Sequence, residues 1–330
     1  MKPVDRGAGA NRGTADRTRR VAGAVCAFLV CVCSMSASAV TPIDQIPAGP
    51  LSPTGRFADL GGYRLHYHCE GPEDAELTVL FESGIGGTTR AWEKVRSRLG
   101  DGLRSCTYDR AGYGWSDPGP GPRDVSELAL ELKDLVDAAG IATPLVLVGH
   151  SYGGFIIREF AYRWPERVAG FVFVDASLTD TLVAIGDDGT KTPKRHPINS
   201  GAIAVGSVDD PDAGGRFLNS RRKAIFAQMA EFQYFEKSAR CVAGHGAPPP
   251  RPAVVLARAD FAATADFERR WLEAQKRFAG SLSDATFQPV EGTGHNIHEQ
   301  RPELVAAAVT DVVARASAGC VAAPTAVPEC

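Results

Sequence analysis

The chain has 330 residues, of which 44% are hydrophobic and 23% are charged, and its formal net charge at pH 7 is −3. This composition is ordinary for a folded globular protein and excludes a disordered chain or a fibrous repeat. A mildly acidic chain without a basic cluster has no electrostatic footprint for nucleic acid, so we expect no nucleic-acid partner.

Residues 1–39 have the layout of a secretory signal peptide. Six basic residues precede an uncharged apolar run from Val21 to Cys33, and small residues follow up to Ala39, where cleavage is expected. The run is shorter than the roughly 20 residues that span a bilayer. We therefore expect a secreted or periplasmic protein without stable membrane insertion after cleavage. The pair Arg19-Arg20 leaves twin-arginine export open beside the general secretory route.

The part that follows the leader is more acidic and retains five cysteines. Cleavage removes six basic and two acidic residues, which moves the formal net charge from −3 to −7. An oxidising compartment favours disulfides, and the odd count leaves one cysteine free or paired outside the chain. The five are Cys69, Cys106, Cys241, Cys320 and Cys330.

Strand-length apolar runs alternate with helical patterns from residue 57 onward, after a proline-rich extended arm at 40–56. Such alternation predicts a mostly parallel sheet with helices on both faces. The expected strands are Arg64–Cys69, Leu77–Glu82, Ser105–Tyr108, Leu145–Val148, Gly170–Val174, Ala253–Leu256 and Phe287–Val290. The expected helices include Val125–Ala139, Phe155–Arg163 and Pro302–Ala316.

The alternation of strand and helix patterns is interrupted at residues 178–250, which we interpret as an inserted cap or lid. This insert has loop-like composition and one helical stretch, Arg216–Ala239. The predicted domains are therefore a core of residues 57–177 and 251–316, the cap, and a C-terminal tail at 317–330. No internal repeat is evident.

The stretch Gly149-His150-Ser151-Tyr152-Gly153 fits the pattern G-x-S-x-G between a predicted strand and a predicted helix. In this context the serine occupies a strained turn that exposes its hydroxyl, and the glycines avoid collisions. A serine needs a base to become a nucleophile. His295, which follows the last predicted strand, is the candidate base, and His298 either faces the same pocket or caps the next helix.

The chain resembles the α/β-hydrolase fold family, in particular its serine esterase-like members, over about residues 57–316. Four segments in the expected order carry the resemblance: FESGIGG from Phe81, YDRAGYGWSD from Tyr108, GHSYGG from Gly149, and GHNIH from Gly294. The resemblance implies an oxyanion hole made by the backbone N–H groups of Ile85 and Tyr152. Many members have His-Gly where this chain has Ser83-Gly84.

The resemblance leaves two candidates for the acid that orients His295. Asp175 directly follows one predicted strand and Asp260 follows the next, and both preserve the order nucleophile, acid, histidine. We favour Asp175, since its surroundings Phe-Val-Asp-Ala-Ser resemble the subgroup with the YDRAGYGWSD motif. Asp260 is the alternative, and it lies in a stretch with two other acids.

The resemblance also suggests roles for residues outside the catalytic group. It assigns Asp109 and Arg110 to a structural segment beside the pocket. It places Cys69 and Cys106 on neighbouring strands, where a disulfide is reasonable, and Cys241 within reach of Cys320 or Cys330. Three aromatic residues are candidates for lining an acyl pocket or for the core, namely Trp92, Trp115 and Tyr152.

The sequence thus predicts a secreted serine hydrolase that cleaves a small-molecule carboxylic ester through an acyl-enzyme, with no metal or organic cofactor implied. A serine at position 151 argues against epoxide hydrolases and haloalkane dehalogenases, which attack with a carboxylate. Amide or carbon–carbon bond hydrolysis, perhydrolysis, and a non-catalytic binding protein of the same fold remain open. The oligomeric state and the substrate preference also remain open.

Overall fold

The computed structural model describes residues 53–178, 218, 220–259 and 265–319. The predicted signal peptide, nearly all of the arm, a large part of the insert and most of the tail lie outside these residues. So does Asp260.

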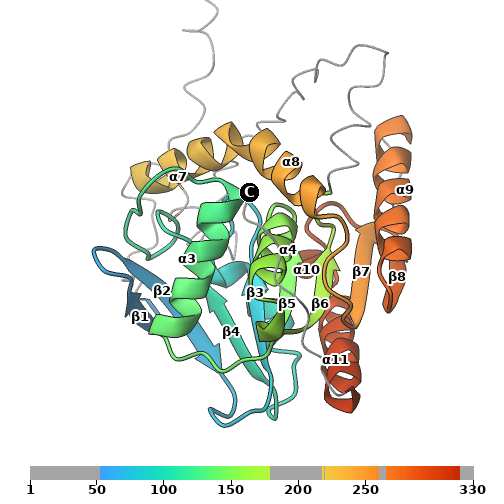
Figure 1. Cartoon of the computed structure of the whole chain (residues 1–330), viewed down its shortest axis with the longest axis horizontal. Helices are drawn as coiled ribbons and strands as arrows, with labels where there is room; N and C mark the ends of the chain where they lie inside the picture. The colour runs from blue at the N-terminus through green and yellow to red at the C-terminus, as the bar shows by residue number, and fades with distance from the viewer. Residues whose placement is uncertain (1–52, 179–217, 219, 260–264, 320–330) are drawn as a thin grey trace, which may run out of the picture. The chain divides into compact units, whose positions relative to one another are not determined.

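An eight-stranded sheet forms the centre of the described chain, with strand order β1-β2-β4-β3-β5-β6-β7-β8 (Figure 1). Strands β3 to β8 run parallel, and β1 and β2 join one edge antiparallel. This confirms the predicted α/β fold class. The strands are β1 Arg56–Asp59, β2 Arg64–Glu70, β3 Thr78–Glu82, β4 Arg104–Tyr108, β5 Leu145–His150, β6 Val168–Val174, β7 Ala253–Arg258 and β8 Ala285–Val290.

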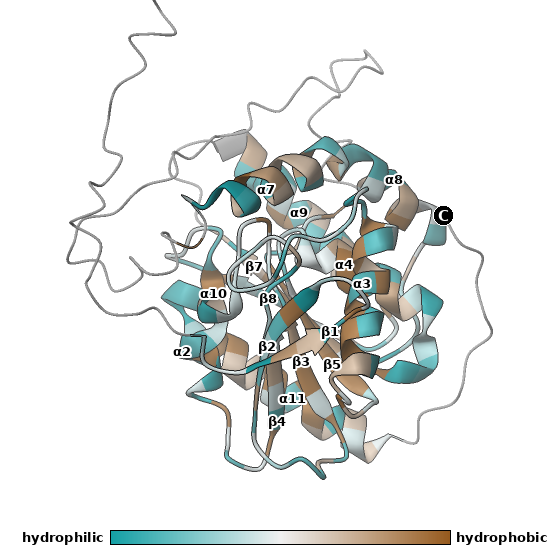
Figure 2. Cartoon of the chain, turned by 90° about the vertical axis from the view of Figure 1, so that its left-hand side faces the viewer, coloured by the Kyte–Doolittle hydropathy of each residue, from teal (hydrophilic) through white to brown (hydrophobic). Residues whose placement is uncertain are grey.

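Helices cover both faces of the sheet, and each face has its own apolar core. Alternation along β5 shows why, because Leu145 and Leu147 pack on one side whereas Val146 and Val148 pack on the other. Strands buried on both faces read as continuous apolar runs. In Figure 2 the central strands are mostly hydrophobic, whereas the surrounding helices mix both kinds of residue. One core includes α3 Val125–Ala138 and α4 Gly153–Arg163, and the other includes α2 Glu93–Arg96 and α11 Pro302–Ala318.

Three elements differ from the expectation. The sequence placed the first strand at Arg64, but β1 precedes it; its four residues bury only Ala58 and carry no periodic signal. The helix expected at Arg216–Ala239 is instead two helices, α7 Arg222–Gln233 and α8 Phe235–His245, which meet at Tyr234. Helix α9, Ala265–Ser281, lies between β7 and β8 and was not expected as an element.

Helices α7 and α8 lie at one end of the sheet (Figure 1), and α8 packs against α3 and α4. Ala227 of α7 packs against Gly112, in the loop after β4, where an added Cβ would approach within 2.7 Å. The two helices bury different faces, with Ala224, Ala227 and Glu231 inward on α7 and Ser238, Ala239 and Val242 inward on α8. The break at Tyr234 allows this change of direction. The domain boundaries themselves remain a prediction.

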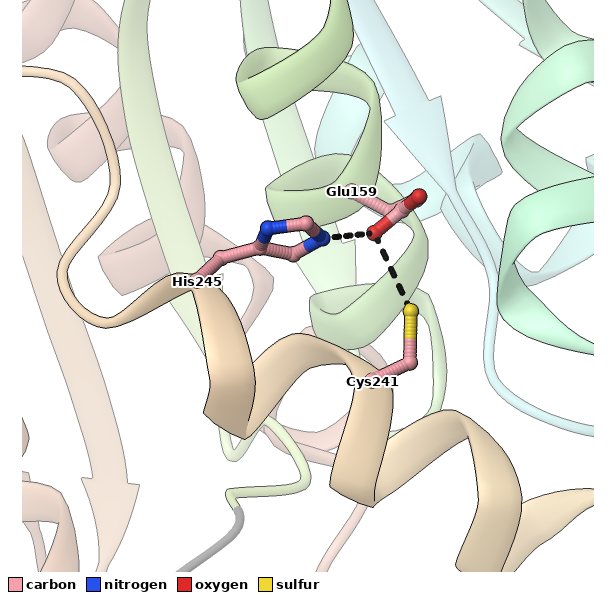
Figure 3. A group of neighbouring side chains, drawn as sticks. All are labelled: Glu159, Cys241 and His245. Carbon is pink, nitrogen blue, oxygen red and sulfur yellow. Dashed lines mark hydrogen bonds and ion pairs between the residues drawn. The ribbon is translucent and has the colours of Figure 1, made fainter. Parts of the chain in front are cut away.

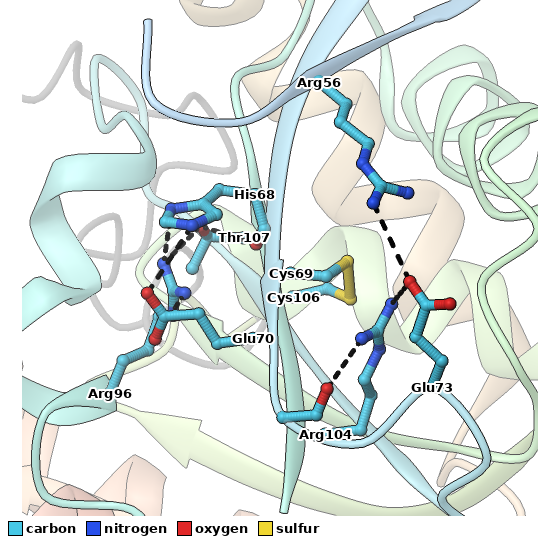
Figure 4. Close-up of a disulfide and its surroundings, with 10 residues drawn as sticks. Arg56, His68, Cys69, Glu70, Glu73, Arg96, Arg104, Cys106 and Thr107 are labelled. Atoms are coloured by element: carbon cyan, nitrogen blue, oxygen red, sulfur yellow. Dashed lines mark hydrogen bonds and ion pairs between the residues drawn. A yellow bond between two sulfur atoms is a disulfide. The ribbon is translucent and has the colours of Figure 1, made fainter.

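A disulfide joins Cys69 of β2 to Cys106 of β4, the pair that the resemblance suggests. The two residues are directly opposite each other in the antiparallel register. Figure 4 shows the bridge between the strands, with Arg104 and Glu73 beside it. Within the described residues, no helix has the length and apolar character needed to cross a bilayer.

Candidate active site

Ser151 occupies a sharp turn between β5 and α4. Its φ of 51° lies in the left-handed region that side-chain-bearing residues rarely adopt. The flanking glycines make this turn possible: a Cβ on Gly149 would lie 2.7 Å from Ile157, and one on Gly153 would lie 2.5 Å from the Glu82 carbonyl oxygen. The turn therefore has the backbone strain and the close packing that the G-x-S-x-G pattern predicts.

The loop that carries Asp175 is hydrogen-bonded to this turn. The N–H of Ser151 donates to the Val174 carbonyl over 3.3 Å, and the N–H of Ser177 donates to the Ser151 carbonyl over 2.8 Å. Asp175 has a positive φ of 43° as well. Two strained residues, one after β5 and one after β6, thus lie side by side at the carboxyl ends of neighbouring parallel strands.

His295 lies in the loop between β8 and the short helix α10, Ile297–Gln300, and its ring is paired with Asp175. Its Nδ1 is 2.6 Å from Asp175 Oδ2. The carboxylate is fully buried, whereas 42% of the His295 side chain is exposed. This geometry orients the ring and directs Nε2 away from the carboxylate, as a histidine base requires.

Asp175 accepts several further hydrogen bonds. Trp271 Nε1 donates to Oδ1 over 2.7 Å, the Arg258 backbone N–H donates to Oδ1 over 3.1 Å, and Arg258 Nη1 donates to Oδ2. Burial by itself would raise the pKa of Asp175, but the hydrogen bond from His295 and the charges of His295 and Arg258 outweigh it and hold the pKa below its ordinary value. The acid is therefore ionised at neutral pH.

The structure brings Asp175 to His295, and the alternative acid Asp260 lies outside the described residues. The Ser151 hydroxyl and the His295 ring are not hydrogen-bonded to each other in the described part of the chain. Catalytic contacts of this kind often tighten only when a substrate is bound. Sequence reasoning missed Arg258 and Trp271, since neither belongs to a motif and both reach the site through tertiary packing.

The loop after β3 lies against Ser151. A Cβ on Gly84 would be 3.0 Å from both the Ser151 Cβ and His150 Nδ1, so a larger residue at this position would require these neighbours to shift. Neither the Ile85 N–H nor the Tyr152 N–H donates a hydrogen bond to another described residue. Two unused donors beside a serine are the feature that an oxyanion hole needs.

The His150 ring lies against the rings of both His298 and His295 in tilted arrangements. The rings of His150 and His298 are 4.3 Å apart between centroids, and those of His150 and His295 are 4.6 Å apart. His150 Nε2 is 3.0 Å from the His295 carbonyl oxygen, which makes it the donor there. Burial lowers the pKa of His150 well below its ordinary value and that of His298 to about 3, so both rings are neutral. His298 is buried rather than open to the pocket.

The aromatic candidates for an acyl pocket prove to be core residues in two of three cases. Trp92 and Tyr152 are fully buried, and the polar end of each has a partner inside the protein. Trp92 Nε1 donates to Ser83 Oγ over 2.8 Å, and the Tyr152 hydroxyl is 2.8 Å from Ser238 Oγ. Only Trp115 is half-buried. Trp92 and Tyr152 therefore have no exposed surface with which to line an acyl pocket.

A second polar cluster joins α4 to α8 (Figure 3). His245 Nε2 lies 3.1 Å from Glu159 Oε2, and Cys241 Sγ lies 3.5 Å from the same oxygen. These ligand types could hold a metal ion. However, Cys241 is disulfide-bonded, so its sulfur is not a thiolate ligand. Its partner lies outside the described residues, and the choice between Cys320 and Cys330 remains open.

Comparisons with known proteins agree with this architecture. The model of a family described as "Alpha/beta hydrolase family" matches residues 79–308. An "AB hydrolase superfamily protein" of Gibberella zeae is 26% identical over 280 residues, which cover 71% of this chain and 85% of the relative. A "Probable transporter efuK" of Hormonema carpetanum is 38% identical over 129 residues, and these cover 37% of this chain but only 18% of that relative.

The crystal structure of the enol-lactonase from Burkholderia xenovorans LB400 is similar in fold. Its TM-score is 0.58 at 19% sequence identity, and the match covers 78% of this chain and all of the other. At this identity the likeness concerns the fold alone.

Proposed function

This chain belongs to the alpha/beta hydrolase family, and from that premise we propose that it is a serine hydrolase that cleaves a carboxylic ester through an acyl-enzyme. The observation that carries the proposal is the pairing of the buried Asp175 with the partly exposed His295, beside the strained Ser151. Asp175 is the proposed acid, His295 the base and Ser151 the nucleophile.

Acylation begins when His295 Nε2 accepts the Ser151 proton and Oγ attacks the ester carbonyl carbon. The π electrons of the carbonyl move to its oxygen, which becomes an oxyanion. The backbone N–H groups of Ile85 and Tyr152 donate hydrogen bonds to this oxyanion. The ionised Asp175 keeps the proton of His295 on Nδ1 and stabilises the imidazolium that forms. When the tetrahedral intermediate collapses, His295 gives its proton to the departing alcohol and the acyl group stays on Ser151.

Deacylation repeats these steps with water. His295 removes a proton from the water, whose oxygen attacks the acyl carbon, and the second tetrahedral intermediate releases the carboxylic acid as the proton returns to Ser151. Positioned N–H donors matter because they meet charge that develops only in the transition state; the loss of one typically slows the reaction about 10²- to 10³-fold.

The enol-lactonase of similar fold shows that this fold can serve ester chemistry, because an enol-lactone is a cyclic ester. Esters also demand less of the leaving group than amides do, since an alkoxide or enolate departs more readily than an amide anion. The fold alone does not decide the reaction, so the substrate class is tested directly.

Labelling and turnover test the proposal together. A fluorophosphonate probe should label the native protein at Ser151, and p-nitrophenyl esters of increasing chain length should be hydrolysed. The matched control, Ser151→Ala, should lose the label and more than about 10³-fold in kcat, since a triad without its nucleophile retains little activity. A folded native protein that neither reacts with the probe nor hydrolyses any ester contradicts the proposal.

We further propose that residues 1–39 direct export. The Cys69–Cys106 disulfide supports this, because such bridges persist in oxidising compartments. Expression of the full chain in a bacterium, followed by mass spectrometry of the mature N-terminus, should locate cleavage after Ala39. An uncleaved chain retained in the cytoplasm would overturn this part.

A further inference from the structure

Arg110 directly follows β4 and Asp109, and only 2% of it is exposed. All five of its N–H donors have an acceptor. Nη1 donates to Glu82 Oε1 and to the Ser83 carbonyl, each over 2.6 Å. Nη2 donates to the Gly84 carbonyl over 2.9 Å. The remaining two donors reach Glu231, through Nε to Oε1 over 3.0 Å and through Nη2 to Oε2 over 2.8 Å.

The hydrogen bond to Gly84 bears directly on the proposed oxyanion hole. The Gly84 carbonyl and the Ile85 N–H belong to one peptide unit, which is planar and trans, so the two groups point in opposite directions. Arg110 draws the carbonyl oxygen toward itself and thereby directs the Ile85 N–H to the other side. The Gly84 Cα lies against Ser151 on this loop. The Gly87 N–H donates to the same carbonyl over 3.1 Å, so the guanidinium and this turn together hold the orientation of the Ile85 N–H, a donor that Arg110 does not touch.

Glu231 belongs to α7, in the predicted cap, and lies 121 residues after Arg110. It is fully buried, and its carboxylate forms a bidentate pair with Arg110. The Tyr113 hydroxyl donates to Oε2 over 2.8 Å, and Arg123 Nη2 donates to Oε1 over 3.2 Å. Burial favours the neutral acid, but the two arginines hold the pKa of Glu231 below its ordinary value. Glu231 is therefore a fixed negative charge against Arg110.

The second carboxylate beside Arg110 is a weaker counter-charge. Burial raises the pKa of Glu82 to about 7, and Tyr108 hydroxyl donates a short hydrogen bond to it. Arg110 therefore depends on Glu231 for a partner that is ionised throughout the neutral range. Gln228, one turn before Glu231, also lies within van der Waals reach of the Gly86 position in the same loop.

We propose that Glu231 is a positioning residue for the oxyanion hole: through Arg110 and the Gly84–Ile85 peptide, the cap helix contributes to the direction of the Ile85 N–H. The inference rests on the proposed function, because it assigns that N–H to the transition state. If so, the rate of catalysis depends on the position of α7 relative to Arg110.

The decisive comparison is between Glu231→Gln and Arg123→Gln. Both variants remove one charge from the same buried cluster, but only Glu231→Gln removes the charge that contacts Arg110 directly, because Arg123 contacts Glu231 and not Arg110. With a p-nitrophenyl ester, Glu231→Gln should lower kcat about tenfold with KM within about twofold, since a misdirected donor loses part of the 10²- to 10³-fold that one donor provides. A trifluoromethyl ketone, whose bound adduct carries the oxyanion, should bind about tenfold more weakly. Arg123→Gln should lose clearly less in both measurements, because Glu231 keeps both of its hydrogen bonds from Arg110.

A spectroscopic measurement on the same variants needs no turnover. In protein labelled with ¹⁵N-isoleucine, the Ile85 amide resonance, assigned with Ile85→Val, should move in Glu231→Gln and move far less in Arg123→Gln. Glu231→Asp, which keeps the charge on a shorter side chain, should lie between native and Glu231→Gln, and it serves if the glutamine variant does not fold.

Two outcomes would overturn the inference. One is a folded Glu231→Gln protein with native kcat, analogue binding and Ile85 resonance; the other is an equal loss in both glutamine variants, which would indicate a merely structural cluster. Failure of the proposed function is recognised separately, as a native protein without probe labelling or ester hydrolysis, and in that case the Ile85 resonance still decides whether Glu231 orients the peptide.

Discussion

Asp175 and His295 are 120 residues apart in sequence, yet His295 Nδ1 lies 2.6 Å from Asp175 Oδ2. The carboxylate is fully enclosed by protein while the imidazole reaches solvent. An acid that is buried, ionised and paired on one side leaves the opposite ring nitrogen available for proton transfer. This relationship is the basis for assigning the acid.

The first prediction concerns that assignment. Asp175→Asn should lower kcat about 10³- to 10⁴-fold, because an amide can hold His295 in the wrong tautomer. Asp260→Asn is the matched control and should lose less than about tenfold. Steady-state hydrolysis of a p-nitrophenyl ester measures both, and circular dichroism establishes that each variant is folded. The reverse pattern would transfer the role to Asp260.

A second prediction concerns the hydrogen bond from His150 Nε2 to the His295 carbonyl. His150→Leu should lower kcat about tenfold, because a buried hydrogen bond of about 1 kcal/mol helps to hold the loop that carries His295. His150→Gln places an amide donor near the same position and should lose less than about threefold. Equal losses in the two variants would show that ring packing, rather than the hydrogen bond, positions the loop.

A third prediction follows from Glu82, whose pKa burial raises from 4.5 to about 7. The folded state holds this proton more tightly than the unfolded state, so the stabilisation is complete below about pH 4.5 and is lost as the pH rises through about 7. The contribution is at most about 3 kcal/mol. Urea unfolding at about pH 5 and pH 8 should show a smaller pH dependence in Glu82→Gln than in the native protein. An unchanged dependence would mean that Glu82 titrates normally.

The fourth prediction is that the Cys69–Cys106 disulfide stabilises the edge of the sheet. It closes a loop with a sequence separation of 37, for which the chain-entropy model gives about 4 kcal/mol. The double variant Cys69→Ser, Cys106→Ser should lose on the order of 2–4 kcal/mol of unfolding free energy. Mass spectrometry after alkylation checks the bridge in the native protein, and native-like stability of the variant would contradict the prediction.

Short patterns in the sequence were sufficient to predict much of the fold. The strands β5, β6 and β7 can be recognised in the sequence as apolar runs, because strands buried on both faces have few polar positions. The turn at Ser151 can be recognised because its close packing requires glycine at nearby positions in the sequence. In contrast, β1 is too short and too exposed to leave a pattern, and the break between α7 and α8 at Tyr234 has no proline or glycine to announce it.

The sequence by itself determined the fold class, the candidate nucleophile and the candidate base, because each depends on residues that are neighbours along the chain. It left the acid open, since Asp175 and Asp260 both follow strands and local context cannot say which meets His295. Only the tertiary structure brought Asp175 to that ring, and only it joined Arg110 to Glu231. Contacts between residues more than a hundred positions apart depend on how strands and helices pack, and no local pattern records that packing.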